Sequence, residues 1–284
     1  RHLHDRFPGV KVDLFGGEPT CREDLVEIIE MARGYGLQPR VVTNGLRFAD
    51  EKYCSEVFAT RCQLMLGLDG LDPVIQNKLR KNPGSLQKKL KAIDNIEKHL
   101  KGKLTVMCTT APGISEELMP DLIQLCFDKR RLITRMMLIP VQAGAGPEKV
   151  DIESATVEDV EHMMAQVFPG LEFVPVGAMR RMKNIQEVLG LNLQLGGTHP
   201  NCECIAVMAG NAASGGYAPP SHYLRMPFKQ TIRELMAWDA AMSPKLDRGI
   251  LGKLFGRRGR KVHLMLALAL FARRHVHIGK IAGD

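Results

Sequence analysis

Short β-rich segments alternate with longer helical segments through the first half of the chain, and this alternation limits the fold more than any other feature. The β-rich segments are 10–15, 38–42, 63–68, 104–109 and 135–139, and helical patterns occupy 22–35, 50–59, 73–100 and 116–127. The longest helical pattern has an apolar stripe of period 3.6, formed by Leu86, Leu90, Ile93, Ile96 and Leu100. Such alternation predicts an α/β fold with a parallel sheet and helical crossovers, either doubly wound or barrel-like.

Polar or glycine-rich strings follow all five β-rich segments. In order they are Gly16-Gly17-Glu18-Pro19-Thr20, Thr43-Asn44-Gly45, Asp69-Gly70, Thr109-Thr110-Ala111-Pro112-Gly113 and Pro140-Val141-Gln142-Ala143-Gly144. In parallel βα folds the chemistry lies at the carboxyl ends of the strands. The sequence therefore predicts one functional rim built from these five strings.

The first string has two interpretations. Adjacent glycines let a backbone approach a ligand closely, and the carboxylate of Glu18 beside them suits an ammonium group. Alternatively, the string is an ordinary strand-to-helix turn in which Thr20 is the N-cap of a helix and Glu23 completes a capping box. This string by itself does not separate the two.

Taken together and in order, the strings resemble the core of the radical S-adenosylmethionine (SAM) superfamily. The resemblance implies a partial (β/α)6 TIM-like barrel in which the first βα unit is missing and five strands are visible. It implies that Gly16, Gly17 and Glu18 bind the methionine amino group of SAM. It also implies that Thr43, Asn44 and Asp69 face SAM or substrate, and that Val141 contacts adenine.

Further strings are similar to the tetraether-lipid-synthase-like branch of this superfamily. They are Leu-Asp-Gly-Leu-Asp-Pro-Val from residue 68, Pro-Gly-Ile-Ser-Glu-Glu-Leu from residue 112, Ile-Pro-Val-Gln-Ala-Gly from residue 139 and His-Pro-Asn-Cys from residue 199. The branch implies a [4Fe–4S] cluster that cleaves SAM, an external electron donor, and radical chemistry on an unactivated C–H bond of a lipid or other small-molecule substrate.

The three-cysteine loop that holds this cluster in the family, Cys-x-x-x-Cys-x-x-Cys, is absent from the 284 residues. We expect it just before Arg1 in a longer parent protein, so that the chain alone is inactive. The alternative is a degenerate homologue without a cluster, which binds SAM but does not catalyse a reaction. A doubly wound nucleotide-binding protein is a third reading, although no Gly-x-Gly-x-x-Gly or Walker string supports it.

Two of the seven cysteines, Cys202 and Cys204, stand one residue apart in a loop rich in Gly and Pro. The family resemblance implies that they bind an auxiliary iron–sulfur cluster, with His199 as a supporting donor; the alternative is a structural pair. For the other five cysteines we expect burial in the core. The odd number and the lack of a signal peptide predict a reducing, cytoplasmic setting.

The chain carries a net charge of +8, much of it in two places. One is Lys78, Arg80, Lys81, Lys88, Lys89 and Lys91; the other is Arg257, Arg258, Arg260, Lys261, Arg273 and Arg274. Both are solvated helix faces in one reading, and in the other they attract phosphate or anionic lipid headgroups at a membrane surface. No feature predicts specific binding of nucleic acid. The apolar run 262–272 is too short to cross a bilayer and fits an interfacial or buried helix.

The pattern changes near residue 146, which suggests a radical SAM core over 1–146 and a C-terminal extension over 147–284. In the extension we expect helices at 157–167 and 180–188, a short strand at 171–175, a loop-rich stretch over 196–220 and a basic helical tail.

Overall fold

The structure is a computed structural model, and it describes residues 2–7, 9–74, 84–142, 153–189, 204–211, 213–248, 250–277 and 279–280. The chain divides into two compact units, Arg1–Met163 and Met164–Asp284. The domain boundary expected at residues 146 and 147 lies outside the described residues. Each unit is considered by itself below.

The first unit is built on a five-stranded sheet in which all four strand pairings are parallel and the strand order is β1-β2-β3-β4-β5. The strands are β1 (Lys11–Leu14), β2 (Gln38–Thr43), β3 (Gln63–Gly67), β4 (Leu104–Thr110) and β5 (Ile133–Pro140). Each lies within two residues of its predicted bounds at either end. The α/β class and the parallel sheet are confirmed, and the order of the strands in the sheet follows their order along the chain.

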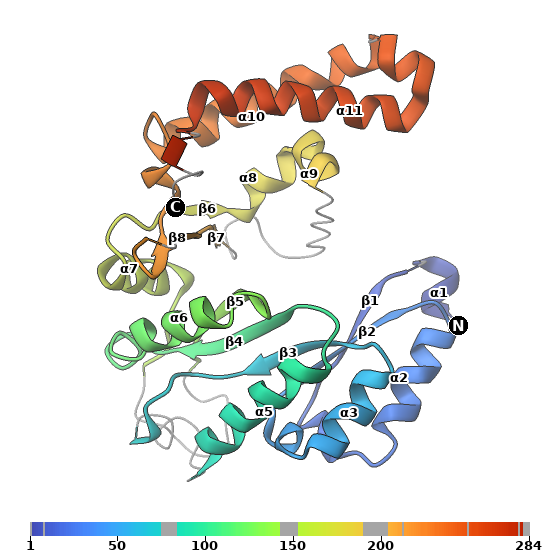
Figure 1. Cartoon of the computed structure of the whole chain (residues 1–284), viewed down its shortest axis with the longest axis vertical. Coiled ribbons are helices and arrows are strands. Elements are labelled where there is room, and N and C mark those ends of the chain that lie inside the picture. Colours follow the sequence, from blue (N-terminus) through green and yellow to red (C-terminus); the bar gives the residue numbers. More distant parts are fainter. Residues whose placement is uncertain are drawn as a thin grey trace. The chain divides into compact units, whose positions relative to one another are not determined.

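Helices connect the strands. They are α1 (His2–Arg6), α2 (Leu25–Gly34), α3 (Glu51–Ala59), α5 (Ser85–His99), α6 (Met119–Asp128) and α7 (Val157–Val167), with the 3-10 turns η1 (Pro19–Cys21) and η2 (Leu46–Ala49). Helices α3 and α5 pack side by side, and α5 also covers η2 (Figure 1). The apolar stripe predicted on α5 faces the interior of the unit, because Leu86, Ile93 and Ile96 are buried. Buried side chains of α2, α3, α5 and α6 and of strands β2 to β4 form the core of this unit.

The second unit combines short strands with helices. It contains β6 (Phe173–Pro175), α8 (Val176–Arg181), α9 (Lys183–Leu189), β7 (Cys204–Ala206), β8 (Ala209–Asn211), β9 (Gly216–Ala218), η3 (Pro220–His222), α10 (Phe228–Arg248) and α11 (Ile250–His275). Strands β6 and β7 pair antiparallel, as do β8 and β9. Within the loop-rich stretch expected over 196–220, sequence reasoning missed the strands β7, β8 and β9, because strands of three residues leave no readable alternation in sequence.

The basic tail forms two long helices, α10 and α11, which run beside each other (Figure 1). Their shared core includes Met242 and Leu264, with Trp238 packed against them. A buried carboxylate ties α10 to α9, since Asp239 accepts hydrogen bonds from the backbone N–H groups of Asn184 (3.3 Å) and Ile185 (2.7 Å). The side-chain amide of Asn184 also donates a hydrogen bond to the backbone carbonyl of Asp239, at 2.8 Å. Within the part of the chain that the structure describes, no helix is long and apolar enough to cross a membrane.

Candidate functional site

Because the five strands are parallel and adjacent in chain order, their carboxyl ends face one edge of the sheet. The strings after β1, β2 and β3 are fully described, and the string after β5 is described as far as Gln142. The rim predicted from sequence therefore exists as one edge of a single sheet, which is where α/β folds place their ligands.

Glu18, in the middle of the first string, joins the ends of β1 and β2. Its Oε1 accepts hydrogen bonds from the backbone N–H of Thr20 (3.1 Å), the Thr20 hydroxyl (2.7 Å) and the Thr43 hydroxyl (2.6 Å). Its Oε2 accepts from the backbone N–H of Asn44 at 2.7 Å. We call these four bonds the Glu18 clasp. Because hydrogen bonds to a carboxylate are about twice as strong as neutral ones, the clasp fixes the two loops against each other.

The clasp also bears on the second interpretation of the first string, the capping box. Thr20 lies inside η1 and does not cap α2, which begins at Leu25 after Asp24. The capping box is therefore wrong. The hydroxyl of Thr20 donates instead to the Glu18 carboxylate. The same carboxylate also accepts the hydroxyl of Thr43, which lies 25 residues after Glu18 in the chain.

The two glycines before Glu18 are held in backbone conformations that other residues rarely adopt. Gly16 has φ +123° and Gly17 has φ +36°, and a Cβ built on either one would meet no atom within 4 Å. Both residues are exposed. The positive φ angles, and not packing within the chain, account for the glycines, and the main chain at both positions is exposed.

The second string is tightly ordered. Thr43 is buried, and its hydroxyl accepts a hydrogen bond from the backbone N–H of Gly45 (3.0 Å) while donating to Glu18. Asn44 is exposed, and its side-chain oxygen accepts from the backbone N–H of Leu46 at 2.9 Å. Of the predicted ligand-facing residues in this string, Asn44 is thus the one at the surface.

Asp69 is fully buried at the end of β3. Its Oδ1 accepts a hydrogen bond from the backbone N–H of Thr109 in β4, at 2.8 Å, and its carbonyl accepts the Cys108 thiol at 3.5 Å. The carboxylate therefore links the third and fourth strand ends. Val141 continues the ladder after β5: its N–H donates to the carbonyl of Thr110 (2.9 Å), and its side chain is half-buried.

Lys89 was missed as a site residue by sequence reasoning, which assigned it to a solvated face. It is 3% exposed, and its ammonium donates a hydrogen bond to the carbonyl of Gly67, the last residue of β3, at 2.7 Å. The signal was present in the sequence, because Lys89 follows Leu86 by three residues and precedes Ile93 by four, on the apolar stripe of α5. The other lysines described in this run, Lys88 and Lys91, are exposed as expected.

Two further groups that the sequence did not single out hold the second loop. The Arg47 guanidinium donates to the carbonyl of Thr20 and lies over the Tyr53 ring, 4.3 Å from its centroid. Burial raises the pKa of Tyr53 to about 12, so this phenol is neutral at physiological pH. Arg47 therefore adds a second link between the loops that the Glu18 clasp joins.

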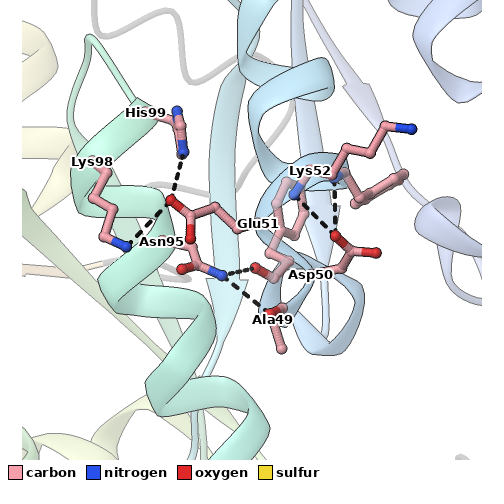
Figure 2. A network of polar contacts seen from close by, with 9 residues as sticks. Ala49, Asp50, Glu51, Lys52, Asn95, Lys98 and His99 are labelled. Atoms are coloured by element: carbon pink, nitrogen blue, oxygen red, sulfur yellow. Dashed lines mark hydrogen bonds and ion pairs between the residues drawn. The ribbon is translucent and has the colours of Figure 1, made fainter.

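Figure 2 shows how α5 supports the same loop from behind. The side-chain amide of Asn95 donates to the carbonyls of Phe48 (3.0 Å) and Ala49 (3.1 Å), at the end of η2. Beside it, Glu51 Oε1 lies 3.3 Å from Lys98 Nζ and 3.6 Å from His99 Nε2 (Figure 2). Asn95 is buried, so it satisfies carbonyls that water does not reach.

The residues that the structure describes do not offer a ligand set for an iron–sulfur cluster. Among them there is no group of three or more Cys, His, Asp or Glu side chains that could hold a metal ion. Cys204 is the first residue of β7, whereas Cys202 and His199 lie outside the described residues. Burial raises the pKa of Cys54 to about 12 and that of Cys126 to about 11, which keeps these thiols protonated.

Comparison with known proteins gives a match over the same part of the chain. A family model described as the radical SAM superfamily matches residues 1–126, which contain the Glu18 clasp, Asp69 and Lys89. Over these residues the chain is similar to the radical SAM superfamily. The match ends before β5, so Val141 and the whole second unit lie beyond it.

Two curated relatives illustrate the similarity. A PqqA peptide cyclase of Bradyrhizobium diazoefficiens is 27% identical over 119 residues, which cover 42% of this chain and 31% of that protein. The mycofactocin maturase MftC of Mycolicibacterium smegmatis is 26% identical over 92 residues, covering 32% of this chain and 23% of that protein. The chain thus spans less than a third of the length of these relatives.

Among solved structures, Streptococcus suis SuiB bound to S-adenosylmethionine has a TM-score of 0.47 and 16% sequence identity, with 55% of this chain and 35% of that chain covered. A structure of TYW1 with a lysine-pyruvate adduct has a TM-score of 0.43 and 16% identity, covering 58% of this chain and 52% of the other.

Proposed function

We propose that this chain is part of a radical SAM enzyme and forms its SAM-binding rim. The observation that carries the proposal is the Glu18 clasp, which holds an exposed pair of positive-φ glycines at the carboxyl edge of the sheet. A rigid loop with open main chain beside a carboxylate suits an amino acid, whose ammonium needs acceptors and whose carboxylate needs donors.

The clasp leaves room for such a ligand. Glu18 Oε2 accepts one hydrogen bond, from Asn44 N–H, and a carboxylate oxygen can accept two. A ligand ammonium would take the second position on Oε2, together with the main-chain carbonyls of the exposed loop at Gly16 and Gly17. Asn44 and Val141, the first exposed and the second half-buried, would line the same edge, while Thr43 and Asp69 act from below by holding the strand ends.

The second cofactor of the proposed enzyme, a [4Fe–4S] cluster, needs three thiolates, and the described residues do not fit it. In the proposal these thiolates come from outside the described residues, as in a longer parent that carries the three-cysteine loop. An auxiliary cluster at Cys202 and Cys204 stays a proposal for the same reason. We derive no catalytic step from this chain and expect the chain alone to be inactive.

For the substrate we propose an unactivated C–H bond of a lipid, and the resemblance to the tetraether-lipid-synthase-like branch supports that choice. The relatives support a second candidate, a peptide substrate, since one of them is named a PqqA peptide cyclase. An external electron donor is part of either version.

The test is production of 5′-deoxyadenosine by the parent protein with the three-cysteine loop, reconstituted with iron and sulfide without oxygen and reduced with dithionite in the presence of SAM. We expect the product, and we expect its loss when the three cysteines are changed to alanine. No product from a fully loaded cluster would contradict the proposal. Calorimetry on the present chain addresses the alternative, because micromolar SAM affinity without iron would favour a binding module that has lost its cluster.

A further inference from the structure

One face of helix α11 packs against helix α10 along its length from Leu264 to His275. Leu264 is completely buried in the core shared with α10, and Ala267 packs against that core. One turn further, the Phe271 ring lies 5.9 Å from the Trp238 ring, centroid to centroid. The face ends at His275, whose Nε2 lies 2.6 Å from Glu234 Oε2 of α10. The spacing of three and four residues places all of these on one side of α11.

The opposite side of α11 is also apolar, although it faces solvent. Val262 is 51% exposed, Met265 54%, Leu266 59% and Leu270 68%. They recur at spacings of three and four residues, so they form one stripe along two turns, which we call the outer stripe. Solvent exposure of a single large apolar side chain is ordinary, but four in one stripe mark a binding surface.

Charge identifies what this surface fits. In the whole of α11 there is no Asp or Glu, and there are seven cations: Lys253, Arg257, Arg258, Arg260, Lys261, Arg273 and Arg274. Lys261 precedes the outer stripe, and Arg273 and Arg274 follow Leu270 by three and four residues; all three are exposed. An apolar stripe with cations at both ends is the pattern of a helix that lies in the plane of an anionic lipid surface.

We infer that the outer stripe of α11 docks this protein onto the surface of an anionic lipid bilayer, with its apolar side chains among the acyl chains and its cations at the headgroups. A second copy of the chain is a poorer occupant, because pairing through this face would bring together two helices with seven cations each. The inference does not rest on the proposed function, since docking requires neither SAM nor a cluster.

The experiment is sedimentation of the full chain with vesicles of phosphatidylcholine, with and without phosphatidylserine. We expect binding to the vesicles that contain phosphatidylserine, and loss of that binding at high salt, because the Debye length falls from about 10 Å at 0.1 M to about 3 Å at 1 M. Leu266→Glu should weaken the binding by about tenfold or more, because it removes an apolar side chain and adds a repelled charge. Arg273→Gln and Arg274→Gln should each weaken it by about fivefold.

Val207→Glu is the matched control, because Val207 lies in the same unit and is 58% exposed. It should bind vesicles as the unchanged chain does. Equal weakening by Leu266→Glu and Val207→Glu would overturn the inference, as would equal binding to neutral and anionic vesicles or no binding to either. Analytical ultracentrifugation without vesicles tests the other occupant: a dimer that Leu266→Glu dissociates would overturn lipid docking in favour of a second copy. Circular dichroism should show that all the variants stay folded, since the altered side chains are exposed.

Discussion

The substitution Gly45→Ala tests how closely the second rim loop is packed against the sheet. Gly45 has φ +82°, and a Cβ on it would lie 2.1 Å from Cδ1 of Leu66, a β3 residue that is completely buried. Two costs follow. A residue with a Cβ costs about 1–2 kcal/mol in a left-handed conformation. Forcing one extra carbon into a packed core adds about 1–3 kcal/mol.

Together these costs reduce the free energy of unfolding by about 2–5 kcal/mol, which is a large part of the roughly 5–15 kcal/mol that stabilises a typical domain. Gly113→Ala is the matched control. It has nearly the same φ, +87°, but a Cβ there would meet no atom within 4 Å. It should therefore show the backbone cost alone, about 1–2 kcal/mol.

The assay is urea unfolding followed by circular dichroism. The unchanged chain and the two variants are fitted with one common slope of unfolding free energy against urea concentration. Tryptophan fluorescence is unsuitable, because the single tryptophan, Trp238, lies in the second unit. Equal losses for Gly45→Ala and Gly113→Ala would refute the reasoning. A second check is the double variant with Leu66→Ala, which removes the colliding atom. Its loss should fall short of the sum of the single losses by about 1–3 kcal/mol, and additivity would count against the contact.

Three other outcomes follow from the rim. Glu18→Gln places an amide N–H₂ opposite the Asn44 N–H or the hydroxyl donors of the clasp. Thermal melting should therefore report a free energy of unfolding that is lower by about 1.5–3 kcal/mol. No change would show that the clasp does not stabilise the fold. Asn95→Ala strips the partner from two buried carbonyls and should cost about 1–3 kcal/mol in urea unfolding; a cost below that of an exposed alanine substitution would contradict this. Burial raises the pKa of Cys54 to about 12, so iodoacetamide at pH 8 should modify the exposed Cys21 and spare Cys54, whose reaction should begin only as the pH approaches 12. Peptide mass mapping checks this, and early labelling of Cys54 would refute it.

The positions of the strands along the chain and of the rim strings could be predicted from the sequence because both depend on local patterns. A continuous apolar run such as Leu64 to Leu66 is typical of a buried strand of a parallel sheet. Once the strands are parallel, the polar string after each run lies at the carboxyl end of its strand. The fold class and the five strand positions follow from this. The short strands β7 to β9 could not be predicted, because three residues do not establish a period.

The roles of individual polar groups depend on partners that lie far along the chain. Glu18 was read as a ligand for an ammonium, but the carboxylate first holds Thr43, 25 residues away. Lys89 was read as a surface cation, but it is buried against the carbonyl of Gly67, 22 residues before it. No local sequence pattern predicts these pairings, because only the packing of the folded chain decides which carbonyl or hydroxyl comes within hydrogen-bond distance of a charged group.

The sequence by itself thus determined a parallel α/β sheet with a glycine-rich carboxyl edge, since strand and helix periods and turn residues are local properties. Only the tertiary structure decided that Glu18 clasps two loops, that Lys89 is internal, and that the apolar run of α11 divides into a face packed on Trp238 and an exposed face that includes Leu270. The physical reason is the same in each case: burial and hydrogen bonding are set by neighbours that are distant in sequence and meet only when the chain has folded.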